Sequence, residues 1–353
     1  ESGGQHGLGK AVQHESSDIG AVIYHSLPEN ESERLIGICK LDSHSIGELP
    51  NQYHYTGKAA FGHFPILEDT YETRESVRGP EAGRIAEGIG FSERRSDDDT
   101  GTSICIPAFA IPGAESNDPE DLVEAIECAA KEWFWPAMEG FVEGGLEISV
   151  QSPNDSEPRR VEITEDDHEF HFTTLRPVAL SPLTDHVEWS AHLEATPNEE
   201  GDIAARSFRS RLPAKAGGGN AESLLIVKQV RADSRYSQKV AVFRGTGMVV
   251  EYREMKELSL AEVNYIAAAP TGLAIRRHSP GTNDAWMDRF LASTEPPAHD
   301  FFDKLSPKAT HRYGKSAVGN ALNEWGKALK TALRDVTQIK PDEEEKSSDN
   351  LSK

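Results

Sequence analysis

Short runs in which apolar and polar residues alternate recur along the chain, and a period of two residues is typical of β-strands. Residues 21–25 and 34–41 are the first such runs, and the turn-forming residues 28–30 between them favour a hairpin loop. Residues 52–64 predict a strand followed by a loop. Further strands are predicted at residues 101–107, 144–150, 160–164, 187–193, 224–230, 240–243, 247–252 and 263–268.

Apolar residues spaced three or four apart predict a helix over residues 118–135. Asp118 is suited to cap this helix and Pro119 to occupy its first turn. The Trp-Phe-Trp sequence at residues 133–135 lies on the apolar stripe, so we expect these aromatic side chains to pack in a core. Shorter helices are predicted at residues 10–17 and 285–291.

A second long helix is predicted over residues 316–337, with one apolar stripe along its length. We expect this stripe to dock on the body of the protein or on a second subunit. It consists of Val318, Leu322, Trp325, Leu329 and Leu333.

Three polar segments separate or follow these elements. Residues 65–99 are acidic and glycine-rich, and we expect an excursion with one short helix outside the core. Residues 214–220 predict a solvated flexible loop, and the acidic tail 341–353 predicts disorder.

Together the elements predict an α+β fold. The domains we expect are residues 1–112, a connecting helix at 113–145, a strand-rich domain at 146–280, a helical region at 281–340 and the tail 341–353.

The composition of the chain argues against several classes of function. The net charge of −22 argues against broad nucleic-acid affinity, although residues 206–211 and 304–330 are locally basic. No apolar run is long enough for a membrane helix. The three cysteines are far apart, which favours buried thiols in a reducing, cytoplasmic compartment and no metal site.

The stretch Gly4-x-x-Gly7-x-Gly9-Lys10 carries the most specific candidate chemistry. Glycines at this spacing let backbone N–H groups approach a polyanion such as a nucleotide phosphate. A P-loop would need a preceding buried strand and a Ser or Thr after the lysine, where this chain has Ala11. A flexible glycine-rich N-terminus is the alternative interpretation.

Gly4-Gln5-His6-Gly7-Leu8-Gly9-Lys10 resembles the ATP-lid motif of the GHKL (Bergerat-fold) ATPase superfamily, which includes gyrase B, MutL and the MORC proteins. The resemblance implies that these seven residues fold over the triphosphate of ATP, with Mg²⁺ as the accompanying ion. It also implies that Gly101 and Thr102, at a strand start, lie near the adenine. A threonine that merely suits a strand start is an equally good interpretation of Thr102.

An ordered set of later segments is similar to bacterial GHKL-type ATP-binding proteins. The resemblance implies the C-terminal part of a Bergerat-type α/β sandwich, followed by a transducer-like α+β domain and a helical C-terminus. The segments are Arg34–Gly37, Tyr55–Gly57, Gly101–Ile104, Trp133–Trp135, Gly247–Val250 and Glu295–Asp300.

Transducer domains of this superfamily supply a lysine to the γ-phosphate. Lys228, Lys239 and Arg244 are the cations in the matching region, and Lys228 is the candidate catalytic residue. A solvated cation on a strand edge is the alternative for each. The superfamily's Glu-x-x-x-Asn and Asp-x-Gly-x-Gly motifs are missing from these 353 residues, so we expect a fragment that begins at the lid and forms no complete ATP site by itself.

The resemblance implies an ATP-binding and ATP-hydrolysing conformational switch that dimerises on ATP binding and acts on a protein partner. A nucleic-acid partner has no support from the charge, and a role in anti-phage defence would be analogy alone. A non-catalytic scaffold in a larger complex is the second hypothesis. A third, a hydrolase or metal site at His168 and His171 beside Asp166 and Asp167, is weaker because such an acidic segment favours a solvated loop.

Overall fold

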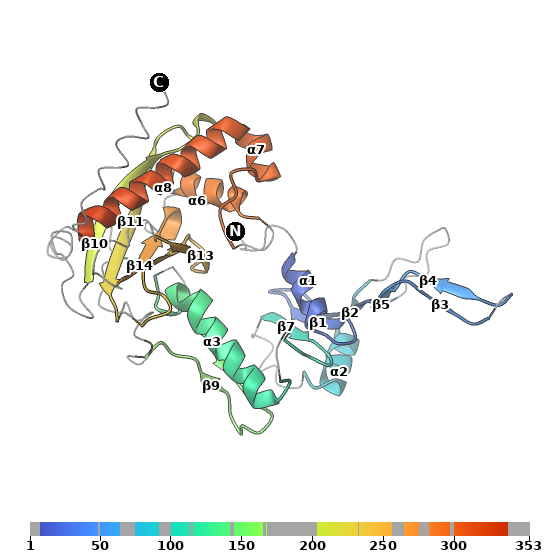
Figure 1. Ribbon diagram of the computed structural model, residues 1–353. Helices are drawn as coiled ribbons and strands as arrows, with labels where there is room; N and C mark the ends of the chain where they lie inside the picture. Colours follow the sequence, from blue (N-terminus) through green and yellow to red (C-terminus); the bar gives the residue numbers. More distant parts are fainter. Residues whose placement is uncertain are drawn as a thin grey trace. The chain divides into compact units, whose positions relative to one another are not determined.

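The computed structural model of the chain describes residues 8–48, 50–63, 75–91, 100–111, 113, 116–141, 145–164, 167, 203–231, 233–255, 265–274, 282–296 and 300–337. Helices and strands are both abundant among them, which confirms the predicted α+β class (Figure 1). The chain divides into two compact units between Leu122 and Val123, within the first turn of helix α3 (Pro119–Met138).

An antiparallel sheet forms the centre of the N-terminal unit. Its strand order is β5-β2-β1-β7, and β6 also pairs with β2. The predicted hairpin is confirmed, because the register joins Ser26 to Arg34 across the loop. The strands are β1 (Ala21–Leu27), β2 (Arg34–Lys40), β5 (Lys58–Phe61), β6 (Val77–Arg78) and β7 (Gly101–Cys105).

Helix α2 (Pro80–Gly88) gives this unit part of its core. Ala82 and Ala86, one helical turn apart, are buried in a cluster with Leu35 and Val77. The prediction that residues 65–99 lie outside the core is therefore wrong for this helix. Pro80 starts the helix, and two small alanines present too little apolar area to stand out in a polar segment.

A two-stranded hairpin of β3 (His44–Ile46) and β4 (Tyr53–Tyr55) belongs to the same unit. All six of its strand residues are exposed, including Ile46 at 58% and Tyr53 at 67%. The ring of His44 stacks on that of Tyr55 with 5.5 Å between centroids. The hairpin therefore presents apolar and aromatic side chains to solvent.

The C-terminal unit is built on a second sheet with the strand order β10-β11-β14-β12-β13. The pairing of β12 with β14 is parallel, and the other pairings are antiparallel. The strands are β10 (Ile203–Arg211), β11 (Asn220–Gln229), β12 (Lys239–Phe243), β13 (Val249–Glu254) and β14 (Tyr265–Pro270).

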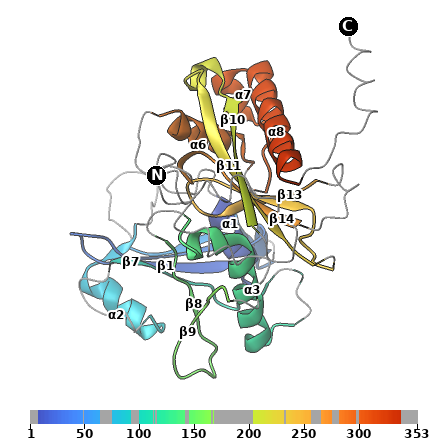
Figure 2. The same cartoon turned by 90° about the vertical axis from the view of Figure 1, so that its left-hand side faces the viewer.

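Both faces of this sheet are buried. Leu225 and Val227 of β11 join one core cluster, which also contains side chains of α6, α7 and α8, whereas Leu224 and Ile226 join a second cluster with Trp135 of α3. Figures 1 and 2 show the helices against the sheet. Burial on both faces explains the uninterrupted apolar runs Leu224–Val227 in β11 and Val240–Phe243 in β12. The helices are α6 (Asn283–Thr294), α7 (Pro307–Tyr313) and α8 (Lys315–Thr337).

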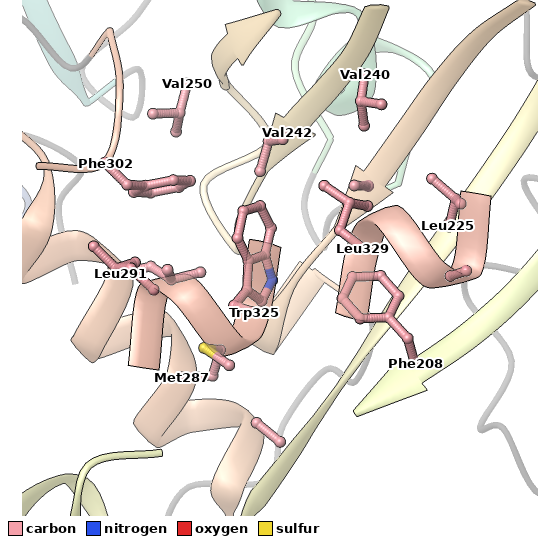
Figure 3. Packing of buried hydrophobic residues seen from close by; sticks show 14 of the residues in the cluster. Phe208, Leu225, Val240, Val242, Val250, Met287, Leu291, Phe302, Trp325 and Leu329 are labelled. Atoms are coloured by element: carbon pink, nitrogen blue, oxygen red, sulfur yellow. The ribbon is translucent and has the colours of Figure 1, made fainter. Parts of the chain in front are cut away.

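The apolar stripe of α8 docks on the body of the protein, as one of the two predicted alternatives states. All five of its predicted residues are buried in the cluster with β10 and β11. Trp325 lies at its centre, with Phe302 and Leu291 on one side and Phe208 and Leu329 on the other (Figure 3).

Strand β10 was not predicted from the sequence. Its arginines and serines mask an alternation in which Phe208 and Ser210 are buried while Ser207, Arg209 and Arg211 are exposed. Arg209 and Arg211 of the basic segment 206–211 therefore lie on the solvent-exposed side of β10, and the other side of this strand packs under α8.

Residues 214–220 form an ordered turn instead of the predicted flexible loop. A short 3-10 helix spans Ala214–Ala216, and Ala216 is fully buried. Gly217 follows with a φ of 91°, and a Cβ atom there would lie 3.1 Å from Cδ1 of Trp286. The glycine is required by both the backbone angle and the close approach of the ring.

Two predicted strands are much shorter in the structure. Residues 144–150 and 160–164 contribute only β8 (Ser149–Val150) and β9 (Arg159–Arg160), which pair with each other. The predicted strand at 187–193 and the tail 341–353 lie outside the described residues.

We predict that Leu329→Ala lowers the free energy of unfolding of the C-terminal unit by about 2–5 kcal/mol, because it opens a cavity under α8. Urea unfolding followed by tryptophan fluorescence measures this unit, since all five tryptophans follow Leu122 in the sequence. Thr331→Ala on the exposed side of α8 is the control, with an expected change within about 0.5 kcal/mol. Equal losses in both variants would contradict the packing of α8 on the sheet.

Candidate functional site

The structure describes the end of the glycine-rich motif. Leu8, Gly9 and Lys10 form the first turn of α1 (Leu8–Glu15), which was predicted at residues 10–17. Gly4, Gln5, His6 and Gly7 lie outside the described residues. The motif therefore runs directly into a helix, and backbone N–H groups of a helix's first turn have no partner within the helix.

Three side-chain hydrogen bonds fix the C-terminal end of α1 and the turn after it. His14 Nδ1 lies 3.0 Å from the carbonyl oxygen of Gly20, and Ser17 Oγ donates to the carbonyl oxygen of Pro107 at 2.7 Å. The Tyr24 hydroxyl donates to Gln13 Oε1 at 2.6 Å. Burial raises the pKa of Tyr24, which keeps this donor protonated. The helix is thus tied to β1, an inner strand of the sheet.

Gly101 and Thr102 begin β7, as predicted. The register places them opposite Leu27 and Ser26 at the end of β1. The Thr102 and Ser26 hydroxyl oxygens are 3.1 Å apart, and Thr102 is exposed. Two hydroxyls at one end of the sheet can donate to and accept from a polar ligand. A threonine that only starts the strand is equally compatible with this geometry.

His25 is a buried titratable residue that sequence reasoning missed. It is 2% exposed, and its ring stacks on Phe91 with 5.7 Å between centroids. Its Nε2 atom lies 3.9 Å from Oε1 of Glu33. In the sequence it is simply one residue of a predicted strand, and the loop that brings Glu33 beside it carries no motif.

Lys228 lies near the end of β11, where it is paired with Ile203 of β10 and Ile266 of β14. It is only 8% exposed. The alternative of a solvated cation on a strand edge is therefore wrong for Lys228, because β11 has a neighbour on each side. Contact of Lys228 with a nucleotide stays a prediction.

Arg244 directly follows β12 and is 4% exposed, so it is not a solvated cation either. Its Nη2 donates to Glu295 Oε2 at 3.0 Å, and its Nη1 lies 3.6 Å from Asp288 Oδ2. The amide of Gly245 donates to the other oxygen of Asp288 at 2.7 Å. This buried cluster ties the end of β12 to helix α6 and the residue that follows it.

Lys239, at the start of β12, has a different environment. It is half-buried, and its ammonium lies 5.5 Å from the centre of the Tyr236 ring. A cation over an aromatic face is stabilised without an anionic partner. The three cations that the sequence grouped together therefore occupy three different environments.

Asp167 is the described member of the acidic segment around His168 and His171. It accepts hydrogen bonds from Lys131 Nζ at 3.0 Å and from the Thr164 amide at 2.9 Å. Burial alone would raise the pKa of Asp167, but these hydrogen bonds hold it below its usual value. Asp166, His168 and His171 lie outside the described residues.

No metal centre is found in the described ranges, where no three or more His, Cys, Asp or Glu side chains form a group that could hold an ion. All three cysteines are free thiols. The expectation that they are buried is wrong for Cys128, which is exposed, while Cys39 and Cys105 are half-buried.

We find no protein-family model and no curated protein that matches this chain. Within the described residues, no helix combines the length and apolar character needed to cross a membrane. The resemblance to GHKL ATPases thus rests on the motifs alone and stays a prediction.

We predict that Arg244→Met lowers the free energy of unfolding of the C-terminal unit by about 3–5 kcal/mol, because Asp288 and Glu295 stay buried without their shared cation. Lys239→Met, at the other end of β12, is the matched control and should cost less than about 1 kcal/mol. Urea unfolding followed by tryptophan fluorescence compares the two. A small and equal loss would show that the cluster does not stabilise the unit.

Proposed function

We propose that this chain supplies the ATP lid and a transducer-like domain of a GHKL-type conformational switch that acts on a protein partner. One arrangement carries the proposal. The glycine-rich motif leads into α1, α1 is tied to β1, and β1 pairs with β7 at Gly101 and Thr102. The order is therefore a glycine-rich loop, a helix and an inner strand, which pairs with a strand that begins with Gly-Thr. The resemblance implies the same order.

The physical basis of the lid is the freedom of its glycines. Gly4, Gly7 and Gly9 can turn the backbone so that several N–H groups face one polyanion, and the first turn of α1 adds its own N–H groups and the positive end of the helix dipole. Phosphate oxygens are the ligand that such a site favours.

The described residues fit a nucleotide at a second point, the hydroxyls of Ser26 and Thr102. Bound ATP would supply the phosphoanhydride bond, and this chain would enclose and orient it. Magnesium has no described carboxylate cluster to hold it. The superfamily takes its general base and a magnesium ligand from a Glu-x-x-x-Asn motif that these residues lack, so we assign no hydrolytic step to this chain.

Among the cations of the C-terminal unit, Lys228 remains the proposed sensor of the γ-phosphate. Arg244 is a poor candidate because Glu295 and Asp288 already hold its guanidinium. In a switch, closure of the lid would favour dimerisation and change what the partner contacts. A cytoplasmic location belongs to the same proposal.

A non-catalytic scaffold is the second candidate, and the exposed hairpin β3–β4 favours it. An isolated two-stranded hairpin is marginally stable in water, and here Ile46, Tyr53 and Tyr55 are at least half exposed. Exposed aromatic side chains are common in protein–protein interfaces. This hypothesis requires no nucleotide.

We predict that a magnesium complex of a non-hydrolysable ATP analogue raises the melting temperature of a protein that joins this chain to the superfamily's Glu-x-x-x-Asn and Asp-x-Gly-x-Gly motifs. At about a hundred times its dissociation constant the ligand stabilises the folded state by about 2.7 kcal/mol. The same titration on these 353 residues should give a much smaller shift, because they lack the adenine-binding motif. No shift in either protein would favour the scaffold.

We predict that Gly7→Ala combined with Gly9→Ala abolishes binding of the analogue by the protein that carries both motifs and leaves the fold intact, because the added Cβ atoms block close approach of phosphate. Isothermal titration calorimetry measures the binding. Gly88→Ala is the matched control, since a Cβ atom there meets nothing within 4 Å. Unchanged binding by the double variant would exclude the lid from the site.

A further inference from the structure

The C-terminal unit contains a pocket of about 300 Å³ between strand β13, the segment before α7 and helix α8. Its apolar lining comes from Phe302, Leu322 and Trp325, which are each less than 8% exposed. The ring of Phe302 lies beside that of Trp325 in the buried cluster of Figure 3, with 5.9 Å between their centroids. The pocket therefore has an apolar floor supported by the core.

The charged side chains that line the pocket are all cationic among the residues that the structure describes. They are Arg253, Lys304, Lys327 and Lys330, and no described Asp or Glu lines it. In a chain with 59 acidic and 37 basic residues, this local excess of positive charge is the reverse of the average. Lys304 and Lys327 are exposed, and neither forms an ion pair with any residue in the described part of the chain.

Arg253, another cation of the pocket lining, is held in place by neighbouring side chains. The guanidinium of Arg253 lies 4.8 Å from the centre of the Trp325 ring, and it forms an ion pair with Glu251. Burial raises the pKa of Glu251, and the charge of Asp300 raises it further. Glu251 offsets part of the charge of Arg253, so an incoming anion depends chiefly on the lysines.

Gly326 keeps the pocket open on the α8 side. It lies in the middle of the helix, where glycine destabilises relative to alanine. A Cβ atom at this position would have one neighbour within 4 Å, Nη1 of Arg253 at 3.9 Å, so the fold does not require a glycine here. The missing side chain leaves space beside the cations.

We propose that this pocket binds a small organic phosphate, a phosphate monoester whose apolar or aromatic group lies on the Phe302, Leu322 and Trp325 floor. A doubly charged phosphate can engage several lysines at once, whereas a carboxylate carries one charge. The volume is at the lower end for ligand sites, which suits a small molecule. All residues of this site belong to the C-terminal unit, and the proposal does not rest on the glycine-rich lid.

Phenyl phosphate is the probe, with inorganic phosphate and benzoate as comparisons. Calorimetry on the 353-residue chain should show that phenyl phosphate binds at least about tenfold more tightly than either, because only it has both a dianion and an apolar group. Binding should weaken when NaCl is raised from about 50 to 200 mM. The NMR signal of the Trp325 indole N–H should shift during the titration.

Lys304→Gln and Lys327→Gln should each weaken phenyl phosphate binding about tenfold. Lys315→Gln is the control on the same helix, because Lys315 is exposed and does not line the pocket. Gly326→Leu should remove binding by filling the pocket while the urea midpoint stays the same or rises, which separates loss of the site from loss of the fold.

Two results would overturn the proposal. Benzoate binding as tightly as phenyl phosphate would assign the pocket to carboxylates. Binding that survives both lysine substitutions and Gly326→Leu would place the ligand elsewhere.

Discussion

Burial of the apolar stripe of α8 is the interaction on which the C-terminal unit depends. The sheet beneath it is apolar on both faces, and a sheet of that kind is stable only when each face is covered. Helix α3 contributes Trp135 to one core cluster, and α8 contributes Trp325 to the other. Each fully buried large apolar side chain contributes about 1.5–3 kcal/mol, so the whole stripe outweighs any single ion pair in the unit.

The long periodic segments were predictable from the sequence. Helix α8 and the strand pair around residues 28–30 follow from spacing alone, because their apolar residues have no other way to be buried. Strand β10 was missed since its buried positions include Ala204, Ala205 and Ser210, which carry little hydrophobic signal. The turn at Gly217 was missed because its order comes from Trp286, a residue distant in sequence.

The candidate sites were likewise only partly predictable from the sequence. Composition could identify cations near residues 228–244, but not which of them would be buried. Arg244 is fixed by carboxylates 44 and 51 residues further along the chain, and Lys228 is enclosed by strands on both sides. Conversely, Lys327 was expected only as part of a helix and of a locally basic segment, and its place beside Gly326 at a pocket depends on how α8 meets β13. Contacts between segments that are distant in sequence decide whether each charged side chain is buried, paired or exposed.

The strand order β10-β11-β14-β12-β13 also has a consequence for synthesis of the chain. Strand β14 lies between β11 and β12, yet it is the last of the five to leave the ribosome. Until residue 270 has emerged, the hairpins β10–β11 and β12–β13 each have an unpaired apolar edge where β14 will insert. Such edges are templates for intermolecular pairing. The nascent chain is therefore most prone to aggregation during the interval between translation of β11 and of β14, and an interaction that shields those edges would protect it then.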